Sequence, residues 1–387
     1  MKKKIAILGS TGSIGKTLIE IIKKDKKNFK IVLLSADENY KELLKQAKFF
    51  NVKNLIITNE NSFNKVKKYR FSKKINIYNN FNNFRKIFKK KINYTMSAIS
   101  GIQGLKPTIE MIKYSENIAI ANKEAIICGW DLIKKQLVRN KTNFIPVDSE
   151  HFSIWSLLNN ESINNVENIF ITASGGPFLK YKLSKLKDVT PKEAIKHPNW
   201  NMGKKISVDS ATLMNKVFEI IEAQRIFKVN LNKFEILIHP NSYLHAIVKF
   251  ENGLTKMLVH DTSMTIPIFN TIYSENSRKL KNNSINLSYL NNLNLSKPDI
   301  KRFPILKIIN LIPKNISLFE TVIIAVNDEL VNYFLKKKIS FLDMQKYLLK
   351  ILKFNQFKKY CYKKPQNINQ ITKVMEEARL KTKNVCV

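Results

Sequence analysis

The chain has few cysteines and no long apolar run. Its 387 residues include three cysteines, Cys128, Cys361 and Cys386, and no Cys-x-x-Cys pair. This usage argues against a disulfide scaffold or a zinc ribbon and fits a reducing compartment. No apolar run approaches the roughly 18 residues of a membrane span. Lysines open the chain, but the apolar run at 5–8 is too short for the h-region of a signal peptide. We therefore expect no targeting segment, no membrane partner and a cytoplasmic location.

Acidic residues are also scarce. The chain has 67 Lys and Arg against 30 Asp and Glu, a formal charge of +37. Such a charge often marks a nucleic-acid-binding protein. Here the lysines are spread along nearly the whole chain beside many Asn and Ile residues, which share A/T-rich codons. No zinc-finger or RNA-binding signature accompanies them. Codon bias is the simpler explanation, so we expect no nucleic-acid partner.

The first part of the chain alternates between strand and helix patterns. The length suits two or three domains. Over residues 1–147, strand-like runs at 4–8, 31–34, 55–58, 75–78, 94–99, 118–121 and 144–147 are interspersed with helical patterns such as 40–50 and 104–112. This alternation predicts an α/β fold with a Rossmann-type, doubly wound parallel sheet.

From residue 148 the pattern changes. Strands are predicted at 169–172, 236–238, 245–250 and 255–259, and Asn252-Gly253 predicts a hairpin between the last two. A helix should begin near Asp209 or Ser210, which are good N-cap residues, and continue to about Phe227. We expect an α+β domain over 148–273, a linker rich in Asn and Ser over 274–299, and a C-terminal α-helical domain over 300–387.

A glycine-rich turn follows the first predicted strand. Gly9, Gly12 and Gly15 form a G-x-x-G-x-x-G pattern between a strand and a helix. Glycine lets the backbone approach a pyrophosphate, and the N-terminus of the helix stabilises its negative charge. A plain strand–helix turn is the alternative, but this context is the one that dinucleotide binding requires.

Acidic residues gather in two short segments. Asp148 and Glu150 end an extended run, where a spacing of two puts both carboxylates on one face of a strand. Asn215, Lys216 and Glu219 share one face of a predicted helix. Three carboxylates with an amide and a lysine can hold a hard divalent cation and a phosphate together. The alternative, solvated surface acids, is less attractive in a chain with so few acids.

Other polar residues have ordinary alternatives. His151 and His197 could be packed or hydrogen-bonded histidines. Ser174, beside two glycines, could belong to a phosphate-holding backbone nest or to an ordinary turn. Lys123 follows a predicted strand end, where α/β sheets place ligands, but a lone lysine is more often solvated.

Taken together, these segments resemble the 1-deoxy-D-xylulose 5-phosphate reductoisomerase family of the non-mevalonate isoprenoid pathway. The resemblance covers roughly residues 1–275 in family order, and the C-terminal region matches chiefly at AVNDE (325–329). The matching blocks are ILGSTGSIG (7–15), ANKE (121–124), PVDSEH (146–151), SGGPF (174–178), HPNW (197–200), KISVDSAT (205–212), MNK (214–216) with Glu219, and LIHP (237–240).

The resemblance implies an oxidoreductase that uses NADPH and a divalent cation, Mg²⁺, Mn²⁺ or Co²⁺. Family members rearrange the ketose phosphate, by retro-aldol cleavage and re-addition or by an α-ketol shift. They then reduce the resulting aldehyde to 2-C-methyl-D-erythritol 4-phosphate. The resemblance also implies that residues 148–273 form the catalytic, metal-binding and dimerisation domain of a homodimer.

Site residues follow from matching positions. The resemblance implies that Asp148, Glu150 and Glu219 bind the metal, which would act as a Lewis acid. It implies that Lys123 and His197 are catalytic, with Lys123 stabilising oxyanion charge. Trp200 would lie on a mobile lid. The implied substrate contacts are Ser149, Ser174, His197, Ser210, Asn215 and Lys216, and the implied cofactor contacts are Thr11, Gly12, Ser13, Ile14, Asn39, Asn122, Glu124 and Gly203.

Two segments depart from the family pattern. Asp37 and Glu38 follow the second strand, where an acid usually accepts hydrogen bonds from the ribose 2′-OH and selects NADH. We still expect NADPH, because Asn39 matches a family contact, Lys41 is close, and the positive chain favours the more anionic cofactor. Residues 262–267 (TSMTIP) replace the usual Asp-Met-Arg-Thr-Pro beside the nicotinamide site.

The main rival is another Rossmann reductase, such as a semialdehyde dehydrogenase. That class needs a cysteine nucleophile on its catalytic domain. Cys128 lies in the predicted cofactor domain, and the other two cysteines lie near the C-terminus. The cysteine positions therefore favour the reductoisomerase.

Overall fold

The computed structural model describes residues 2–68, 75–273, 278–281 and 284–386. Contacts within the chain divide it into two compact units. The first unit contains Met1–Ile126, Trp130–Asp148 and Met264–Leu280, and the second contains Ile127–Gly129, Ser149–Ser263 and Lys281–Val387.

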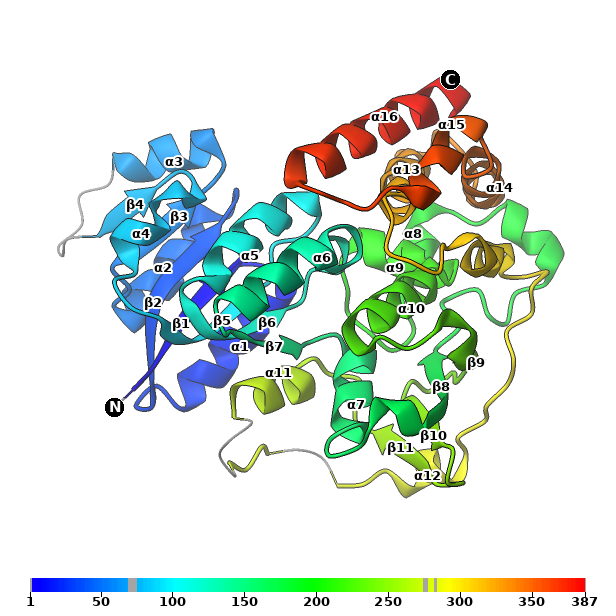
Figure 1. Cartoon of the computed structure of the whole chain (residues 1–387), viewed down its shortest axis with the longest axis horizontal. Coiled ribbons are helices and arrows are strands. Elements are labelled where there is room, and N and C mark those ends of the chain that lie inside the picture. The colour runs from blue at the N-terminus through cyan, green and yellow to red at the C-terminus, as the bar shows by residue number, and fades with distance from the viewer. Residues whose placement is uncertain (1, 69–74, 274–277, 282–283, 387) are drawn as a thin grey trace. The chain divides into compact units, whose positions relative to one another are not determined.

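The first unit is built on a seven-stranded sheet with the order β4-β3-β2-β1-β5-β6-β7 (Figure 1). All neighbouring strands are parallel, which confirms the predicted α/β fold. The strand order reverses between β1 and β5, where such sheets bind ligands at their carboxyl ends. The strands are β1 (Lys3–Leu8), β2 (Phe29–Ala36), β3 (Asn54–Ile57), β4 (Asn76–Tyr78), β5 (Ile92–Ser97), β6 (Ser115–Ile120) and β7 (Asn143–Pro146). The helices are α1 (Ser13–Lys24), α2 (Tyr40–Phe50), α3 (Glu60–Lys67), α4 (Phe84–Ile87), α5 (Leu105–Ile112), α6 (Lys123–Arg139) and α11 (Thr265–Ile272).

Both faces of this sheet are buried. Ile5 and Ile7 of the central strand join one apolar cluster, whereas Ala6 and Leu8 join another. Because alternate side chains of a strand point to opposite faces, the two clusters cover opposite faces of the sheet. A parallel strand covered on both sides reads as an unbroken apolar run, which is why β1 was recognisable in the sequence.

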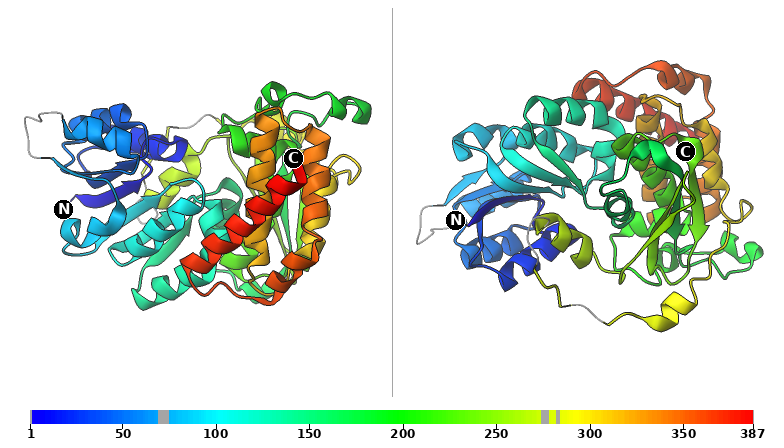
Figure 2. Two further views of the ribbon diagram at one scale, coloured as in Figure 1. Left: turned by 90° about the horizontal axis from the view of Figure 1, so that it is seen from above. Right: turned by 60° about the horizontal axis from the view of Figure 1, so that its bottom comes forward.

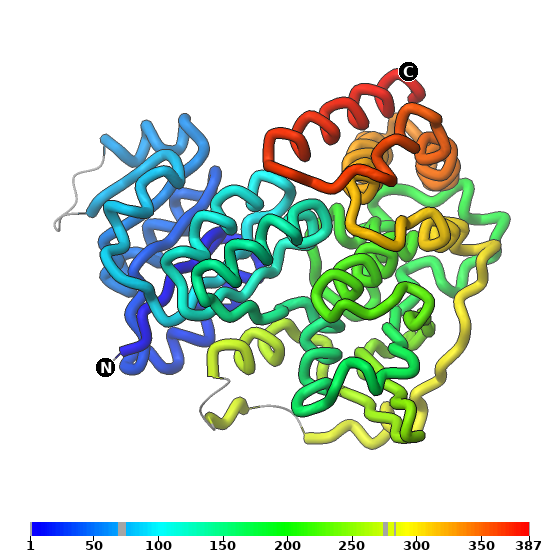
Figure 3. The backbone as a smooth tube through the Cα atoms, viewed as in Figure 1, coloured from blue at the N-terminus to red at the C-terminus, as the bar shows by residue number. Residues whose placement is uncertain are grey.

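Helix α11 completes the first unit by packing on α1 (Figure 3). Ile268 and Ile272 join the same cluster as Ile5, and the Tyr94 hydroxyl lies 2.8 Å from the Thr271 hydroxyl. This placement differs from the predicted domain boundary at residue 273, because the apolar face of a helix does not reveal which core it will cover. Residues 274–277 and 282–283 of the predicted linker lie outside the described residues.

The second unit combines a four-stranded mixed sheet with helices. In the order β11-β10-β8-β9, only β8 and β9 are parallel. Gly253, with φ 86°, lies in the predicted hairpin turn between β10 and β11. The predicted helical C-terminal region is confirmed, and its helices are orange and red in Figure 2. The strands are β8 (Val166–Ala173), β9 (Phe234–Ile238), β10 (Leu244–Phe250) and β11 (Thr255–Val259). The helices are α7 (Ser149–Leu157), α8 (Pro191–Ala194), α9 (Lys204–Ala211), α10 (Met214–Phe227), α12 (Leu287–Asn291), α13 (Phe319–Leu335), α14 (Phe341–Ile351), α15 (Asn355–Lys358) and α16 (Ile368–Cys386).

Two local predictions were wrong. The helix predicted from Asp209 or Ser210 to Phe227 is two helices, α9 and α10, because Leu213 between them has φ 63° and ψ 13°. A left-handed residue turns the chain out of the first helix, and nothing in the local sequence signals it. Asp148 and Glu150 do not share a strand face, because β7 ends at Pro146 and Glu150 lies in the first turn of α7. None of the helices among the described residues is long and apolar enough to span a membrane.

Candidate active site

The glycine turn after β1 is tightly packed. Gly9 has φ 83°, and a Cβ there would lie 2.6 Å from the Ala98 carbonyl oxygen. A Cβ on Gly15 would lie 2.4 Å from the Gly9 carbonyl oxygen. Gly12 precedes α1 and provides no side-chain cap for the helix. The first backbone N–H groups of α1 therefore have no side-chain acceptor at the N-cap, as an anion-binding helix end requires.

A cavity of about 680 Å³ lies beside this turn in the first unit. Of the predicted cofactor residues, Thr11 and Gly12 line it, and Ser13 and Ile14 open α1 directly after them. Asn39 caps α2 by accepting a hydrogen bond from the Glu42 amide and does not line the cavity. The other lining residues are Gly9, Ser35, Ala36, Asp37, Thr58, Asn80, Phe81, Asn82, Ala98, Ile99, Ser100, Gln103, Lys106 and Pro107.

Several of these lining residues were missed from the sequence. Asn80, Phe81 and Asn82 follow β4, and residues 98–100 follow β5, so they lie beyond the carboxyl ends of strands. That position was the available signal, because doubly wound sheets bind ligands there. Asp37 also lines the cavity, and one of its carboxylate oxygens accepts a 2.7 Å hydrogen bond from the Thr58 hydroxyl.

Asn122 and Lys123 form the junction between β6 and α6. The Asn122 side-chain oxygen caps α6 by accepting from the Ala125 amide at 2.8 Å. Its side-chain nitrogen donates to the carbonyl oxygens of Ile99 and Gly101, so it also holds a loop that contributes to the cavity wall. Lys123 forms an ion pair with Asp148 and is only 13% exposed, which excludes the alternative of a solvated lysine. Glu124, a predicted cofactor contact, lies in the first turn of α6.

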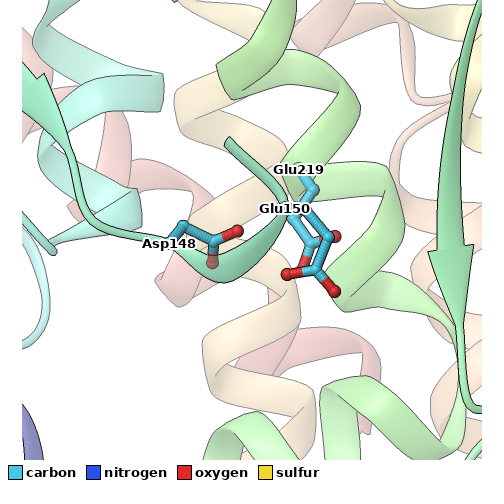
Figure 4. A group of neighbouring side chains, drawn as sticks. All are labelled: Asp148, Glu150 and Glu219. Carbon is cyan, nitrogen blue, oxygen red and sulfur yellow. The ribbon is translucent and has the colours of Figure 1, made fainter. Parts of the chain in front are cut away.

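Three carboxylates come together as the sequence predicted (Figure 4). Asp148 lies between β7 and α7, Glu150 lies in the first turn of α7, and Glu219 lies on α10. One oxygen from each of the three lies within 4.8 Å of the others. Oxygen donors at this separation suit a hard divalent cation. The donor set therefore fits the metal that the family pattern implies.

Lys216 compensates the charge of two of these carboxylates. Its ammonium lies 2.7 Å from Glu150 Oε1 and 2.6 Å from Glu219 Oε2. Burial alone would lower the pKa of Lys216, but the two carboxylates outweigh it and raise that pKa. Asn215 donates to the other oxygen of Glu219, and Ser149 donates to Glu150. The lysine therefore stays charged beside these two carboxylates.

A second group of predicted residues surrounds the loop after β8. Gly176 has φ 70°, and a Cβ there would lie 2.8 Å from Ala211 Cα and 3.0 Å from the Ser210 carbonyl oxygen. The loop that begins at Ser174 therefore packs on the end of α9, which carries Ser210. Ser174 Oγ accepts a 3.1 Å hydrogen bond from the Gly176 amide and lies 2.9 Å from His197 Nε2.

His197 is fixed at both ring nitrogens. Nδ1 accepts from the amides of Asn199 and Trp200 at 3.1 and 2.9 Å, so in the neutral ring Nε2 carries the hydrogen and donates to Ser174. Burial, and then the charge of Lys216, lower the pKa of His197 to about 4. His197 is therefore neutral at pH 7. His151 is buried, and its Nε2 contacts the Glu219 carbonyl oxygen at 2.8 Å, as a hydrogen-bonded structural histidine would.

The segment after His197 is held by polar and aromatic contacts. Asn199 donates to the Pro240 carbonyl oxygen and to the Ser242 hydroxyl at 2.6 and 2.9 Å. Trp200 is only half-buried, which does not support the alternative of a core tryptophan, and its ring meets the His245 ring edge-on at 6.1 Å. Gly203 precedes α9 and is exposed in the second unit, whereas the other predicted cofactor residues belong to the first.

Three family models match most of the chain. The model described as "1-deoxy-D-xylulose 5-phosphate reductoisomerase" matches residues 5–129. The model described as "1-deoxy-D-xylulose 5-phosphate reductoisomerase C-terminal domain" matches residues 144–227, and "DXP reductoisomerase C-terminal domain" matches residues 260–381.

Curated relatives and solved structures agree with these matches. A 1-deoxy-D-xylulose 5-phosphate reductoisomerase of Pelagibacter ubique (strain HTCC1062) is 57% identical over the full length of both chains. That of Wolbachia pipientis wMel is 40% identical over 88% of each chain. The Zymomonas mobilis reductoisomerase in complex with NADPH is 31% identical, with a TM-score of 0.89, over 100% of this chain and 99% of its own. Another reductoisomerase, in complex with NADPH, fosmidomycin and magnesium, is 25% identical, with a TM-score of 0.89, over 99% and 98% of the two chains.

Proposed function

The chain belongs to the 1-deoxy-D-xylulose 5-phosphate reductoisomerase family, and we propose that it converts 1-deoxy-D-xylulose 5-phosphate to 2-C-methyl-D-erythritol 4-phosphate in isoprenoid biosynthesis. The reaction rearranges the carbon skeleton and then reduces an aldehyde, with NADPH and a divalent cation as cofactors. The single observation that carries the proposal is the group of Asp148, Glu150 and Glu219 beside the charged Lys216.

Asp148, Glu150 and Glu219 are the proposed metal ligands. When bound, the divalent cation supplies Lewis acidity that stabilises negative charge on substrate oxygens. Lys216 contributes a permanent positive charge at the same place, because its pKa is raised. Lys123, paired with Asp148, is the second cation of the site and is proposed to stabilise oxyanion charge. Ser149 donates to Glu150, which keeps that carboxylate oriented, and is also a proposed substrate contact.

Ser174, Ser210, Asn215 and Lys216 are proposed to hold the substrate phosphate. The Ser174 oxygen already receives hydrogens from the Gly176 amide and from neutral His197. Its own hydroxyl hydrogen is therefore free to be donated to a phosphate oxygen. His197 thus orients the Ser174 hydroxyl. As a proposed substrate contact, His197 acts as a neutral hydrogen-bonding group and not as a cation.

The segment from His197 to Gly203 is proposed to close over the substrate. Closure would exclude water from the reacting carbons. The half-buried Trp200 and the exposed Gly203 support this proposal, since neither is locked into a core. Hydrogen exchange of this segment should slow when substrate binds. An already fully protected segment that substrate does not affect would contradict closure.

The cavity at the carboxyl ends of β1, β2, β3 and β5 is the proposed NADPH site. When bound, NADPH supplies the hydride for reduction. Thr11, Gly12, Ser13 and Ile14 would contact the pyrophosphate through the turn and the start of α1. Lys106 on the cavity wall can attract the more anionic cofactor, while the hydrogen bond from Thr58 orients one oxygen of Asp37. Asn39, Asn122, Glu124 and Gly203 remain proposed cofactor contacts.

We also propose that the protein is a cytoplasmic homodimer. None of its three cysteines, all of which lie among the described residues, forms a disulfide, which suits a reducing compartment. Strand β11 is an edge of its sheet. Leu254, which precedes the strand, is 57% exposed, and Met257, which lies on it, is 51% exposed. An apolar exposed edge needs a cover, and a second copy of this chain can provide it. Light scattering at micromolar concentration should give twice the chain mass of 45.0 kDa.

A turnover assay with single omissions tests the proposed function. The purified chain is incubated with the ketose phosphate, NADPH and Mg²⁺ or Mn²⁺, and NADPH oxidation is followed by the loss of the absorbance of the reduced nicotinamide. Turnover should require all three components. Turnover that continues after metal is removed with a chelator, or no turnover with the complete mixture, would contradict the proposal.

A further inference from the structure

Two helices of the second unit are joined by a buried polar contact. Asn327 on α13 donates a 2.8 Å hydrogen bond to Asp209 Oδ1 on α9. Asn327 is 3% exposed and Asp209 is 1% exposed. A carboxylate that is so deeply buried needs partners for its charge. The contact therefore ties the helical C-terminal region to α9 at one specific position.

Charged side chains extend this contact. Lys205 Nζ lies 3.2 Å from Asp209 Oδ2 and 3.1 Å from Asp328 Oδ1. Arg379 on α16 lies 3.7 Å from the other oxygen of Asp328. Both oxygens of Asp209 are thus engaged, one by Asn327 and the other by Lys205. The network runs from α16 through α13 to α9.

The residue after Asp209 is a proposed phosphate contact. Asp209 and Ser210 are consecutive in the last turn of α9. Contacts that hold the Asp209 side chain therefore also fix the position of Ser210 around and along the helix axis. The Ser174–Gly176 loop packs on the backbone of the same turn, within 2.8–3.0 Å of a Cβ built on Gly176. The position of α9 therefore sets both Ser210 and the loop that carries Ser174.

We propose that Asn327 is a positioning residue for the substrate phosphate, which it controls through Asp209 and the end of α9. This inference rests on the proposed function. It gives a role to the AVNDE segment at 325–329, which carries Asn327 and Asp328 but no residue of the candidate site. The helical C-terminal region would then shape the phosphate site from outside it.

Asn327→Ala tests this role in the full chain. The KM for 1-deoxy-D-xylulose 5-phosphate should rise by about tenfold, because small displacements of binding groups are costly. The kcat should fall by less than about twofold, because contacts to a non-reacting phosphate are made in both ground and transition states. The KM for NADPH should not change. Asn332→Ala, at an exposed position on the same helix, is the matched control and should leave all three constants unchanged.

A rescue variant separates positioning from general support of the fold. Asn327→Asp alone places two carboxylates together and should weaken substrate binding further. Adding Asp209→Asn restores an amide–carboxylate pair with the roles exchanged, and should return the KM to within about threefold of wild type. If Asn327→Ala does not fold, Lys205→Met removes the other partner of Asp209 at a side chain that is 37% exposed. It should raise the KM in the same direction.

Calorimetric titration with inorganic phosphate gives a readout that does not depend on turnover. Asn327→Ala should bind phosphate about tenfold more weakly than wild type, and Asn332→Ala should bind it equally well. Unchanged phosphate affinity and unchanged KM in Asn327→Ala, with only a lower melting temperature, would overturn the positioning role. A wild-type chain that binds phosphate but does not turn over the sugar phosphate would instead contradict the proposed function.

Discussion

Replacing Lys216 with methionine should make the stability of the protein depend on a divalent cation. In the structure the Lys216 ammonium lies 2.7 Å from Glu150 Oε1 and 2.6 Å from Glu219 Oε2. Glu219 is 1% exposed and Glu150 is 9% exposed, so water cannot compensate their charges. Removing one partner of such a buried ion group costs about 3–5 kcal/mol. At about 2–4 °C per kcal/mol for a domain of roughly this size, the melting temperature in chelator should fall by about 6–20 °C.

A cation held by the same carboxylates should reverse this loss. Thermal unfolding is measured for wild type and Lys216→Met in EDTA and in millimolar Mg²⁺ or Mn²⁺. The variant should gain more stability from the cation than wild type, in which Lys216 already compensates the two carboxylates. Lys204→Met, which removes the same charge at an exposed position, should behave as wild type. The reasoning is refuted if Lys216→Met and wild type have the same melting temperature in EDTA, or if added cation raises the melting temperature of both proteins equally.

Three further perturbations address the histidine, the glycine turn and cofactor choice. The pKa of His197 falls from 6.5 to about 4 on folding, so its contribution to stability is present above pH 6.5 and is lost as the pH falls towards 4. His197→Gln should therefore flatten the pH dependence of the unfolding free energy, measured with urea, between pH 6.5 and about 4. An unfolding free energy that falls with pH as steeply as in wild type would contradict this. Gly15→Ala places a Cβ 2.4 Å from the backbone oxygen of Gly9 and should raise the KM for NADPH at least about tenfold. Gly12→Ala, whose Cβ would be 3.5 Å from the same oxygen, should have a smaller effect, and equal effects would count against the packing argument. Wild type should prefer NADPH over NADH in kcat/KM, and Asp37→Ser should increase that preference by removing a negative charge from the cavity wall. A wild-type preference for NADH would mean that Asp37 binds the ribose hydroxyl.

The strands and several helices could be predicted because their signals are local. β1 is a continuous apolar run covered on both faces, and Tyr40–Phe50 has the predicted bounds, with Asn39 as its N-cap. The break at Leu213 could not be predicted, because a left-handed leucine has no sequence signature. The packing of α11 in the first unit could not be predicted either, because it depends on which apolar core buries Ile268 and Ile272.

The candidate site was predicted where its residues form short motifs. Asp148, Glu150 and Glu219 meet, although the strand geometry invoked for the first two was wrong. The contact of Lys216 with two carboxylates followed from helix spacing for Glu219 but not for Glu150, which is 66 residues away in the chain. Cavity residues such as Gln103 and Lys106 are brought in by the sheet order, which single motifs do not contain.

The central claim is that Asp148, Glu150 and Glu219 hold a divalent cation on which turnover depends. The most direct measurement is the turnover of Glu150→Gln and wild type after chelation, followed by titration with Mn²⁺. Wild type should lose all activity in chelator and regain it with Mn²⁺. Glu150→Gln should stay inactive across the titration while keeping a wild-type circular dichroism spectrum. Full activity of Glu150→Gln in the presence of chelator would contradict the account.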